Sequence, residues 1–154
     1  MAIKKKLHVV DDFVETCATA FRDSGGRVTE TRLSVVRCLS NSEVPLTAKE
    51  IFDRLEKKIK IDQVSIYRIL EAMLALGLVH QVFPGGGFVP CHHTSCDLTH
   101  HILTRCTACN AIEEIHVPVE KVEPLVTFLK SKKKFYPDEH YIQLNGLCEG
   151  CKER

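Results

Sequence analysis

The chain has 154 residues, which is enough for one ordinary domain or two small ones, and its hydrophobic fraction of 44% is typical of a globular protein. Its formal net charge of +1 excludes a general basic coat for nucleic acid, so any contact with DNA must come from a local surface. No apolar run is long enough to cross a bilayer, and no apolar signal core follows the basic start at residues 1–6, so we expect a cytoplasmic protein with no membrane partner.

The cysteines and histidines are distributed unevenly along the chain. Residues 1–90 contain two cysteines and two histidines, whereas residues 91–151 contain six of each. Cysteines in a chain without an export signal indicate metal binding or catalysis before disulfides. This step in composition follows the Pro84–Gly87 turn, and it predicts two modules, the second of which is rich in metal ligands.

The first module shows the periodicity and the capping signals of four helices. Phe13, Cys17 and Phe21 recur at helical spacing, Thr47–Glu50 fits a capping box, and Asp62 is suited to an N-cap. The predicted helices are residues 10–23, a segment from Thr29 or Thr31 to about Leu39, a segment beginning at Thr47, and Gln63–Leu76. Four short helices followed by an apolar hairpin describe a winged helix-turn-helix.

The helix predicted at Gln63–Leu76 has an apolar face and a polar face. At about 100° per residue, the apolar side chains between Ile66 and Met73 gather on one side. Tyr67 and Arg68 lie on the opposite side, where burial does not explain a tyrosine. In a recognition helix Tyr67 would contact a thymine methyl group and Arg68 a phosphate; the alternative is a solvated face with a half-buried tyrosine.

Two short apolar runs flank the turn at residues 84–87 and predict a β-hairpin. If Phe83 pairs with Phe88, counting outward along the strands places His80 directly opposite Cys91. Opposed residues of an antiparallel pair have Cβ atoms about 4.5–5.5 Å apart, which suits two ligands of one zinc ion. The alternatives are an exposed histidine and a buried thiol that bind nothing together, or a hairpin with a shifted register.

Two Cys-x2-Cys pairs give the strongest metal signal in the sequence. Each pair places two thiolates on a tight turn, and two such turns complete a tetrahedral sulfur site of the closed, structural kind. Zinc there would contribute on the order of 10 kcal/mol to folding. Between the pairs we expect a strand at 111–117, a helix at 119–131 and a strand at 140–144. The expected ligands are Cys106, Cys109, Cys148 and Cys151.

The order of these motifs resembles that of the ferric uptake regulator family, and within it the zinc uptake regulator branch. The segments that carry the resemblance are Gly26–Thr29 with Arg32, Val64–Leu70, the histidine- and cysteine-rich linker and the two Cys-x2-Cys pairs. The family implies an α+β protein. Its domains would be a winged helix-turn-helix DNA-binding domain with its wing over residues 1–90, a metal-binding hinge over 91–100, and a small α/β dimerisation domain with the four-cysteine zinc site over 101–154.

The resemblance also implies partners and DNA contacts. Family members act as homodimers on palindromic operators in double-stranded DNA, so two recognition helices would reach one site. Arg27 would point toward a minor groove. The residues that would face DNA are Arg27, Gln63, Ser65, Tyr67 and Arg68.

A regulatory metal site is implied at the hinge. Cys91 stands where an iron sensor usually has glutamate, and its thiolate favours zinc over iron. The spacing of His80, Cys91 and Glu114 matches zinc-sensing members. Alternation along a strand lets only one of His100 and His101 face this site, and we expect His101. The regulatory ligands would then be His80, Cys91, His101 and Glu114, and a second, weaker site would use His100, Glu120 and His140.

We therefore expect a metal-responsive repressor of zinc-uptake genes, with zinc as its cofactor, no enzyme activity and no small-molecule substrate. An iron- or peroxide-sensing relative would share everything except ligand preference, and a zinc-storage or interaction module would not require Tyr67 and Arg68. A zinc deaminase would need a His-x-Glu signature and a proline before its Cys-x2-Cys pair, but Leu147 stands there. The linker residues His92, His93, Cys96 and Asp97 are expected to be solvated, and the alternative for Cys96 is a role as a substitute ligand.

Overall fold

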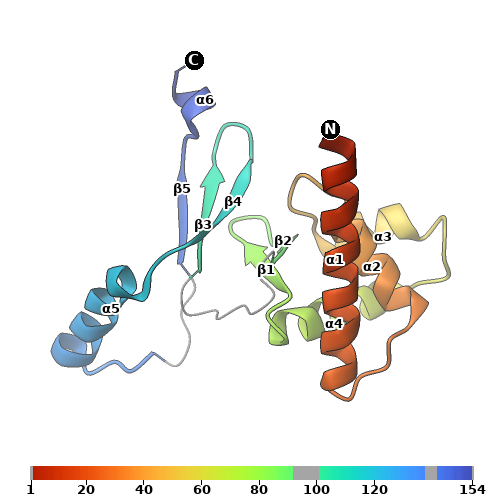
Figure 1. The fold of residues 1–154 in the computed structure, drawn as a ribbon, viewed down its shortest axis with the longest axis horizontal. Coiled ribbons are helices and arrows are strands. Elements are labelled where there is room, and N and C mark those ends of the chain that lie inside the picture. The colour runs from red at the N-terminus through yellow and green to blue at the C-terminus, as the bar shows by residue number, and fades with distance from the viewer. Residues whose placement is uncertain (1, 92–100, 138–141, 154) are drawn as a thin grey trace. The chain divides into compact units, whose positions relative to one another are not determined.

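The computed structural model describes residues 2–91, 101–137 and 142–153. The chain divides into two compact units, residues 1–94 and residues 95–154 (Figure 1). Within the described ranges, no helix is both long enough and apolar enough to cross a membrane.

The N-terminal unit contains four helices and one hairpin, as the sequence predicts. Its elements are α1 (Ala2–Asp23), α2 (Glu30–Ser40), α3 (Ala48–Leu55), α4 (Gln63–Ala75), β1 (Val79–Val82) and β2 (Gly87–Pro90). The first helix begins at Ala2 rather than near residue 10. No glycine or proline interrupts residues 2–9, and once a helix is nucleated each further residue adds a hydrogen bond.

The predicted caps set where three of these helices begin. Thr29, rather than Thr31, caps α2, and its side chain accepts a hydrogen bond from the backbone N–H of Arg32. Thr47 and Glu50 form the predicted capping box at the start of α3. The Asp62 carboxylate accepts a hydrogen bond of 2.8 Å from the backbone N–H of Ser65 in the first turn of α4, and this bond fixes the start of the helix.

One hydrophobic core holds the four helices and the hairpin together. Phe13, Cys17 and Phe21 of α1 are buried in it, as their spacing predicts. The apolar face of α4 from Ile66 to Met73 is buried in the same cluster. Each large apolar side chain buried in this way contributes about 1.5–3 kcal/mol, so the buried face of α4 fixes which of its side chains remain exposed.

The hairpin gains a third backbone partner in the loop before α3. The N–H of Leu46 donates to the Phe88 carbonyl at 3.1 Å, and the N–H of Phe88 donates to the Leu46 carbonyl at 2.8 Å. Gly87 lies so close to Pro45 that an added Cβ would be 2.7 Å from the proline Cβ. These contacts attach the hairpin to the helices as the wing of a winged helix.

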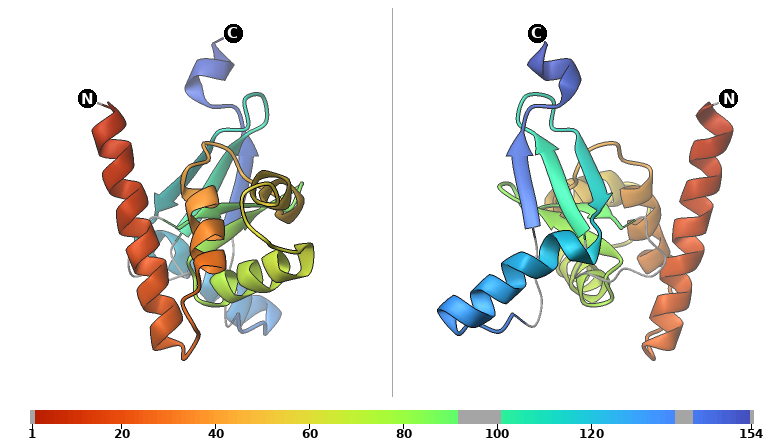
Figure 2. Two further views of the ribbon diagram at one scale, coloured as in Figure 1. Left: turned by 90° about the vertical axis from the view of Figure 1, so that its right-hand side faces the viewer. Right: turned by 60° about the vertical axis from the view of Figure 1, so that its left-hand side comes forward.

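The C-terminal unit is built on a three-stranded sheet. Its elements are β3 (His101–Cys106), β4 (Ile112–His116), α5 (Val119–Phe128), the π-helical turn η2 (Leu129–Lys133), β5 (Ile142–Gly146) and α6 (Glu149–Lys152). The central strand β3 pairs antiparallel with β4 and parallel with β5 (Figure 2). The expected helix at 119–131 corresponds to α5 and the start of η2, and the expected strands at 111–117 and 140–144 correspond to β4 and β5.

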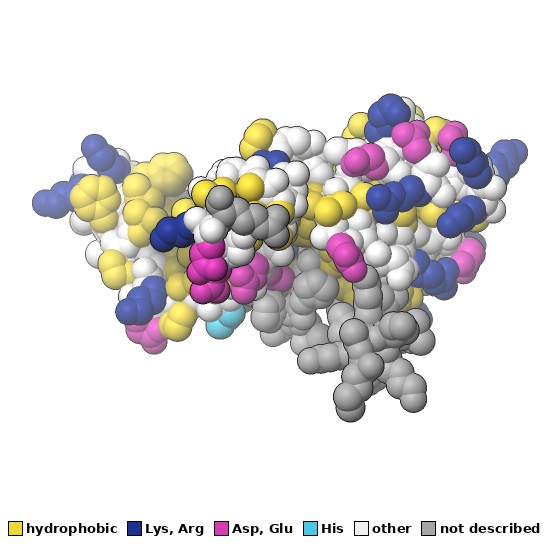
Figure 3. All heavy atoms as spheres, turned by 90° about the horizontal axis from the view of Figure 1, so that it is seen from above, with side chains coloured by type: hydrophobic (Ala, Val, Ile, Leu, Met, Phe, Trp, Pro, Cys, Tyr) yellow, Lys and Arg dark blue, Asp and Glu magenta, His cyan; other side chains and the backbone are white. Residues whose placement is uncertain are grey.

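Charges of both signs share the surface of the N-terminal unit. On the face drawn in Figure 3, Lys and Arg side chains over the helices of this unit are interspersed with Asp and Glu side chains. The formal net charge of the whole chain is +1. Recognition of a polyanion by this face would therefore depend on particular side chains and not on a continuous basic surface.

Candidate metal centres

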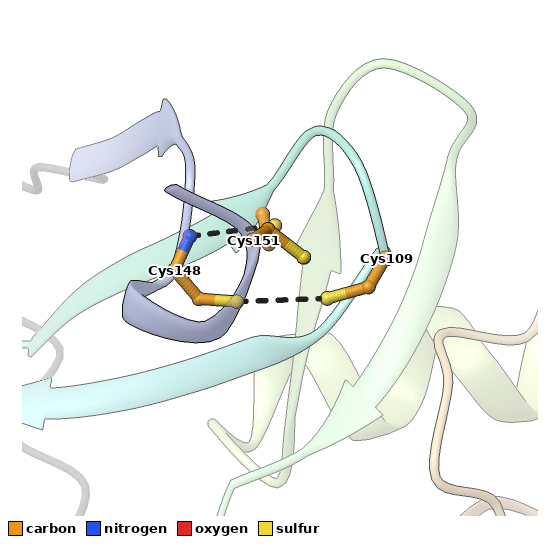
Figure 4. Close-up of side chains that lie close together, drawn as sticks. Cys109, Cys148 and Cys151 are labelled. Carbon is orange, nitrogen blue, oxygen red and sulfur yellow. Dashed lines mark hydrogen bonds between the residues drawn. The ribbon is translucent and has the colours of Figure 1, made fainter. Parts of the chain in front are cut away.

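The four cysteines of the C-terminal unit converge on one point. Cys106 is the last residue of β3 and Cys109 lies in the turn that follows, while Cys148 is the N-cap of α6 and Cys151 lies within this short helix. All four sulfurs lie within 4.8 Å of one another. The Cys109 and Cys148 sulfurs face each other at 3.8 Å (Figure 4).

Backbone N–H groups make the cluster favourable for thiolates. The amide of Cys148 donates to the sulfur of Cys106 at 3.4 Å. Amide donation from Cys109 and Cys148 lowers the pKa of the Cys106 thiol to about 6. The other three sulfurs, and first that of Cys148, stabilise the thiol form of Cys151 and raise its pKa to about 12. All four sulfurs could therefore be thiolates together only with a cation between them.

The spacing and chemistry of these donors fit zinc. Tetrahedral Zn²⁺ with Zn–S bonds of about 2.3 Å holds its sulfurs about 3.8 Å apart, which is the separation found between Cys109 and Cys148. A disulfide would need about 2.05 Å, and no described cysteine forms one. The predicted structural ligands are thus brought together in an arrangement that a zinc ion would complete.

Two residues that sequence analysis did not single out support the cysteine turns. The backbone N–H of Thr107 donates to the Gly146 carbonyl at 2.7 Å, and its hydroxyl donates to the same oxygen at 3.2 Å. Asn110 adopts a positive φ of 60° after the first pair, where its side-chain oxygen accepts a bond from Arg105. An asparagine directly after a Cys-x2-Cys pair is the signal that identifies this turn, because asparagine tolerates the left-handed region.

A second donor pair lies on the wing of the N-terminal unit. His80 of β1 is only 4% exposed, and Cys91, which directly follows β2, is 5% exposed. A ring nitrogen of His80 and the sulfur of Cys91 lie within 4.8 Å of each other. A buried imidazole beside a buried thiol provides two of the four donors that a tetrahedral zinc ion requires.

The predicted register of this hairpin is wrong by two residues. His80 pairs with Val89, not with Cys91, and the N–H of Cys91 instead donates to the Leu78 carbonyl at 2.9 Å. The turn runs from Phe83 to Gly86 because Gly87 is held in β2 against Pro45. His80 and Cys91 are therefore diagonal neighbours on one face of the hairpin, and the imidazole ring is long enough to reach the Cys91 sulfur.

The remaining predicted ligands stay predictions. Glu114 lies on β4, where it pairs with Leu103, and His101 begins β3, where it pairs with His116. Glu120 is exposed in the first turn of α5. The side chain of His101 lies outside the described part of the structure, and so do the whole of residues His92, His93, Cys96, His100 and His140.

Helix α4 presents the polar face that the sequence predicts. Tyr67 is 50% exposed and Arg68 is also exposed, on the side away from the core. Gln63, the first residue of the helix, is exposed beside them. The hydroxyl of Ser65 donates to the Asp62 carboxylate at 2.7 Å, so its first role is in the helix cap. Tyrosine and arginine at the start of such a helix are suited to thymine and phosphate contacts.

A comparison with known protein families decides what kind of protein carries these features. Residues 23–145 match the ferric uptake regulator family, which is most of the chain. The chain belongs to this family. Members of the ferric uptake regulator family are metal-responsive transcription regulators and not enzymes, so the prediction of a regulator without enzyme activity is confirmed by membership.

Individual relatives place the chain near the zinc regulators of the family. The zinc uptake regulation protein of Escherichia coli (strain K12) is 31% identical over 134 residues, which cover 82% of this chain and 74% of that protein. A solved zinc uptake regulator complexed with zinc and DNA has a TM-score of 0.80 at 26% identity and covers 94% of this chain and 95% of its own. The peroxide operon regulator of Bacillus subtilis (strain 168) is 26% identical, with 96% of each chain covered. The likeness to the solved zinc uptake regulator confirms the predicted α+β fold class.

Proposed function

We propose that this protein is a zinc-responsive repressor that controls zinc-uptake genes in the cytoplasm by binding palindromic operators in double-stranded DNA as a homodimer. The observation that carries the proposal is the buried pair of His80 and Cys91 on the wing. A thiolate and an imidazole in one site favour zinc over harder cations. The relatives named for zinc uptake regulation support the same metal.

Two zinc sites would have different tasks. Cys106 and its three partner cysteines would hold a structural ion, because four thiolates leave no open position for exchange. The regulatory ion would be held by His80, Cys91, His101 and Glu114. A further, weaker site would use His100, Glu120 and His140.

The regulatory ligands would couple zinc to DNA binding because they come from both units of the chain. When bound, zinc supplies an attraction that draws the donors of the wing and the donors of β3 and β4 together. A shift from 1% to 99% of the binding-competent arrangement needs about 5.5 kcal/mol of preference for that arrangement. In a two-fold dimer this would fix the distance between two α4 helices, so that both reach one palindrome.

The DNA-facing side chains follow from this arrangement. Tyr67 and Arg68, together with Gln63 and Ser65, would enter the major groove from the start of α4, and Arg27 would reach toward a minor groove. We propose these five residues as the DNA contacts.

The proposal is tested by a DNA gel shift against buffered free zinc. The duplex is one that the zinc-loaded protein itself selects from a randomised library. Cys91→Ser should lose zinc-dependent binding, whereas the control Cys38→Ser, which removes a half-buried thiol of α2, should retain it. Zinc-dependent binding that survives in Cys91→Ser would show that the assigned regulatory site is wrong.

An iron- or peroxide-sensing regulator is the second candidate, because the Bacillus subtilis relative is a peroxide regulator. The same gel shift with buffered Fe²⁺ in place of zinc distinguishes the two. We expect zinc to act at lower free concentration than iron, since the Cys91 thiolate is a soft donor. A zinc-storage or interaction module, in contrast, would bind zinc without retaining any duplex.

A further inference from the structure

The connection between α1 and α2 is held by a side chain that points inward. The last turn of α1 closes with the N–H of Gly26 donating to the Phe21 carbonyl at 2.8 Å, while Gly25 adopts a positive φ of 75°. The chain then continues through Arg27, whose side chain is exposed, to Thr29 at the cap of α2. This short segment carries the proposed minor-groove contact.

Arg32 reaches back from α2 across this segment. Its guanidinium lies over the buried ring of Phe21, with 4.8 Å from Cζ to the ring centroid. The Nη1 group also donates to the backbone carbonyl of Arg27 at 2.9 Å. Its own backbone N–H is bonded to the Thr29 hydroxyl at 3.3 Å. The side chain is half-buried and is held by the Phe21 ring and the Arg27 carbonyl, while the helix cap holds the Arg32 backbone.

Gly26 leaves room for this arrangement. A Cβ at this position would be 2.8 Å from Nη1 of Arg32 and 3.1 Å from the Phe21 carbonyl oxygen. The first distance is shorter than real Cβ contacts, so the guanidinium would have to move away. Glycine at this position therefore lets the arginine lie against the backbone, and no left-handed φ is involved.

We propose that Arg32 is a positioning residue for DNA binding, which acts by holding the backbone of Arg27 and does not itself touch DNA. The inference rests on the proposed function of the protein. Among the described residues, no side chain pairs with the Arg27 guanidinium, so the point from which this exposed side chain extends is set by the backbone that Arg32 holds. The guanidinium of Arg32 is engaged by the Arg27 carbonyl and the Phe21 ring, so its charge faces the protein and not a DNA phosphate.

A double-mutant cycle on the zinc-loaded, full-length protein tests the proposal. Affinity for the selected duplex is measured for Arg27→Ala, Arg32→Met and the double variant, together with the thermal unfolding of each. We expect Arg32→Met to weaken binding about tenfold, and the double variant to bind no more weakly than Arg27→Ala alone, because both changes remove the same contact. Losses that multiply in the double variant would mean that Arg32 contacts DNA independently and would overturn the proposal.

Gly26→Ala is the second arm, because it displaces the Arg32 guanidinium without removing any charge. We expect the same tenfold order of loss as for Arg32→Met, and no further loss when the two are combined. Arg37→Met is the matched control, since it removes one positive charge from an exposed site on the same helix, where Arg37 pairs with Glu30. Gly26→Ala that binds like the wild type, or Arg37→Met that binds as weakly as Arg32→Met, would refute the positioning role. If the wild-type protein selects no duplex at any zinc concentration, the proposed function itself fails.

Discussion

Removal of the zinc that we propose at the four cysteines should unfold the C-terminal unit and leave the N-terminal unit folded. Among the described residues of a single chain, the C-terminal unit buries only Leu103 and Val122 as large apolar side chains, besides Cys106. Full burial contributes about 1.5–3 kcal/mol for each of them, so about 3–6 kcal/mol together. A structural zinc ion contributes about 10–16 kcal/mol to comparable small sites, so the metal outweighs this apolar core. The N-terminal unit has its own core from α1 to the hairpin and does not depend on that ion.

Hydrogen-exchange mass spectrometry of the intact protein measures both units in one experiment. After removal of zinc by a strong chelator, or in Cys106→Ser, we expect the amides of β3 and β5 to exchange at least about a thousandfold faster, because each 1.4 kcal/mol of lost local stability is tenfold. Amides of α2 and α4 should keep their protection. Cys38→Ser serves as the control, since it removes a thiol outside the cluster. Protected β3 amides in zinc-free protein, or equal loss in both units, would refute the reasoning.

Three other predictions concern the N-terminal unit. Leu70→Ala should lower the free energy of unfolding of this unit by about 2–5 kcal/mol in urea titrations, since Leu70 is only 1% exposed in the core, and a loss below 1 kcal/mol would contradict that burial. Thr47→Ala should lower the local stability of α3 by about 1 kcal/mol, which hydrogen exchange of the α3 amides measures. Hydrogen bonds from Thr47 lower the pKa of Glu50, so this cap stabilises the fold above the usual carboxyl pKa and loses its effect as pH falls through the lowered value. The stability cost of Thr47→Ala should therefore shrink in acid. A cost that does not change with pH would contradict this role of the cap. Arg68→Ala should leave stability unchanged, weaken binding to all duplexes and reduce the slope of log affinity against log salt by about 1, whereas an unchanged slope would argue against a phosphate contact.

Helix α4 could be predicted from the sequence almost completely. Its apolar side chains repeat with the helical period, Asp62 supplies the cap, and Gly77 closes it, so three independent local signals agree. The exposure of Tyr67 then follows from geometry alone. The four-cysteine cluster was predictable for a different reason, because the tetrahedral coordination of zinc requires that two distant Cys-x2-Cys pairs meet.

The register of the hairpin could not be predicted from the same kind of signal. Side chains alternate between the two faces of a strand, so a shift of two residues leaves every side chain on its original face. Burial patterns therefore fit both registers equally well. The choice is made by tertiary contacts, since Gly87 lies against Pro45 and Phe88 pairs with Leu46 in a loop far along the chain. His80 and Cys91 lie close together in either register, because both registers keep the two side chains on one face of the hairpin.

The parallel pairing of β3 with β5 has a consequence for the order in which the protein assembles. Ile102 pairs with Ile142, and Thr107 is bonded to Gly146, so these contacts close loops of about forty residues. Contacts between residues so far apart in the chain form slowly, whereas the turn that carries Cys106 and Cys109 closes locally. A newly made chain therefore offers zinc only two thiolates at first. Tight retention of the proposed structural ion would begin when β5 joins the sheet and α6 brings Cys148 and Cys151, so its capture would be a late step of folding.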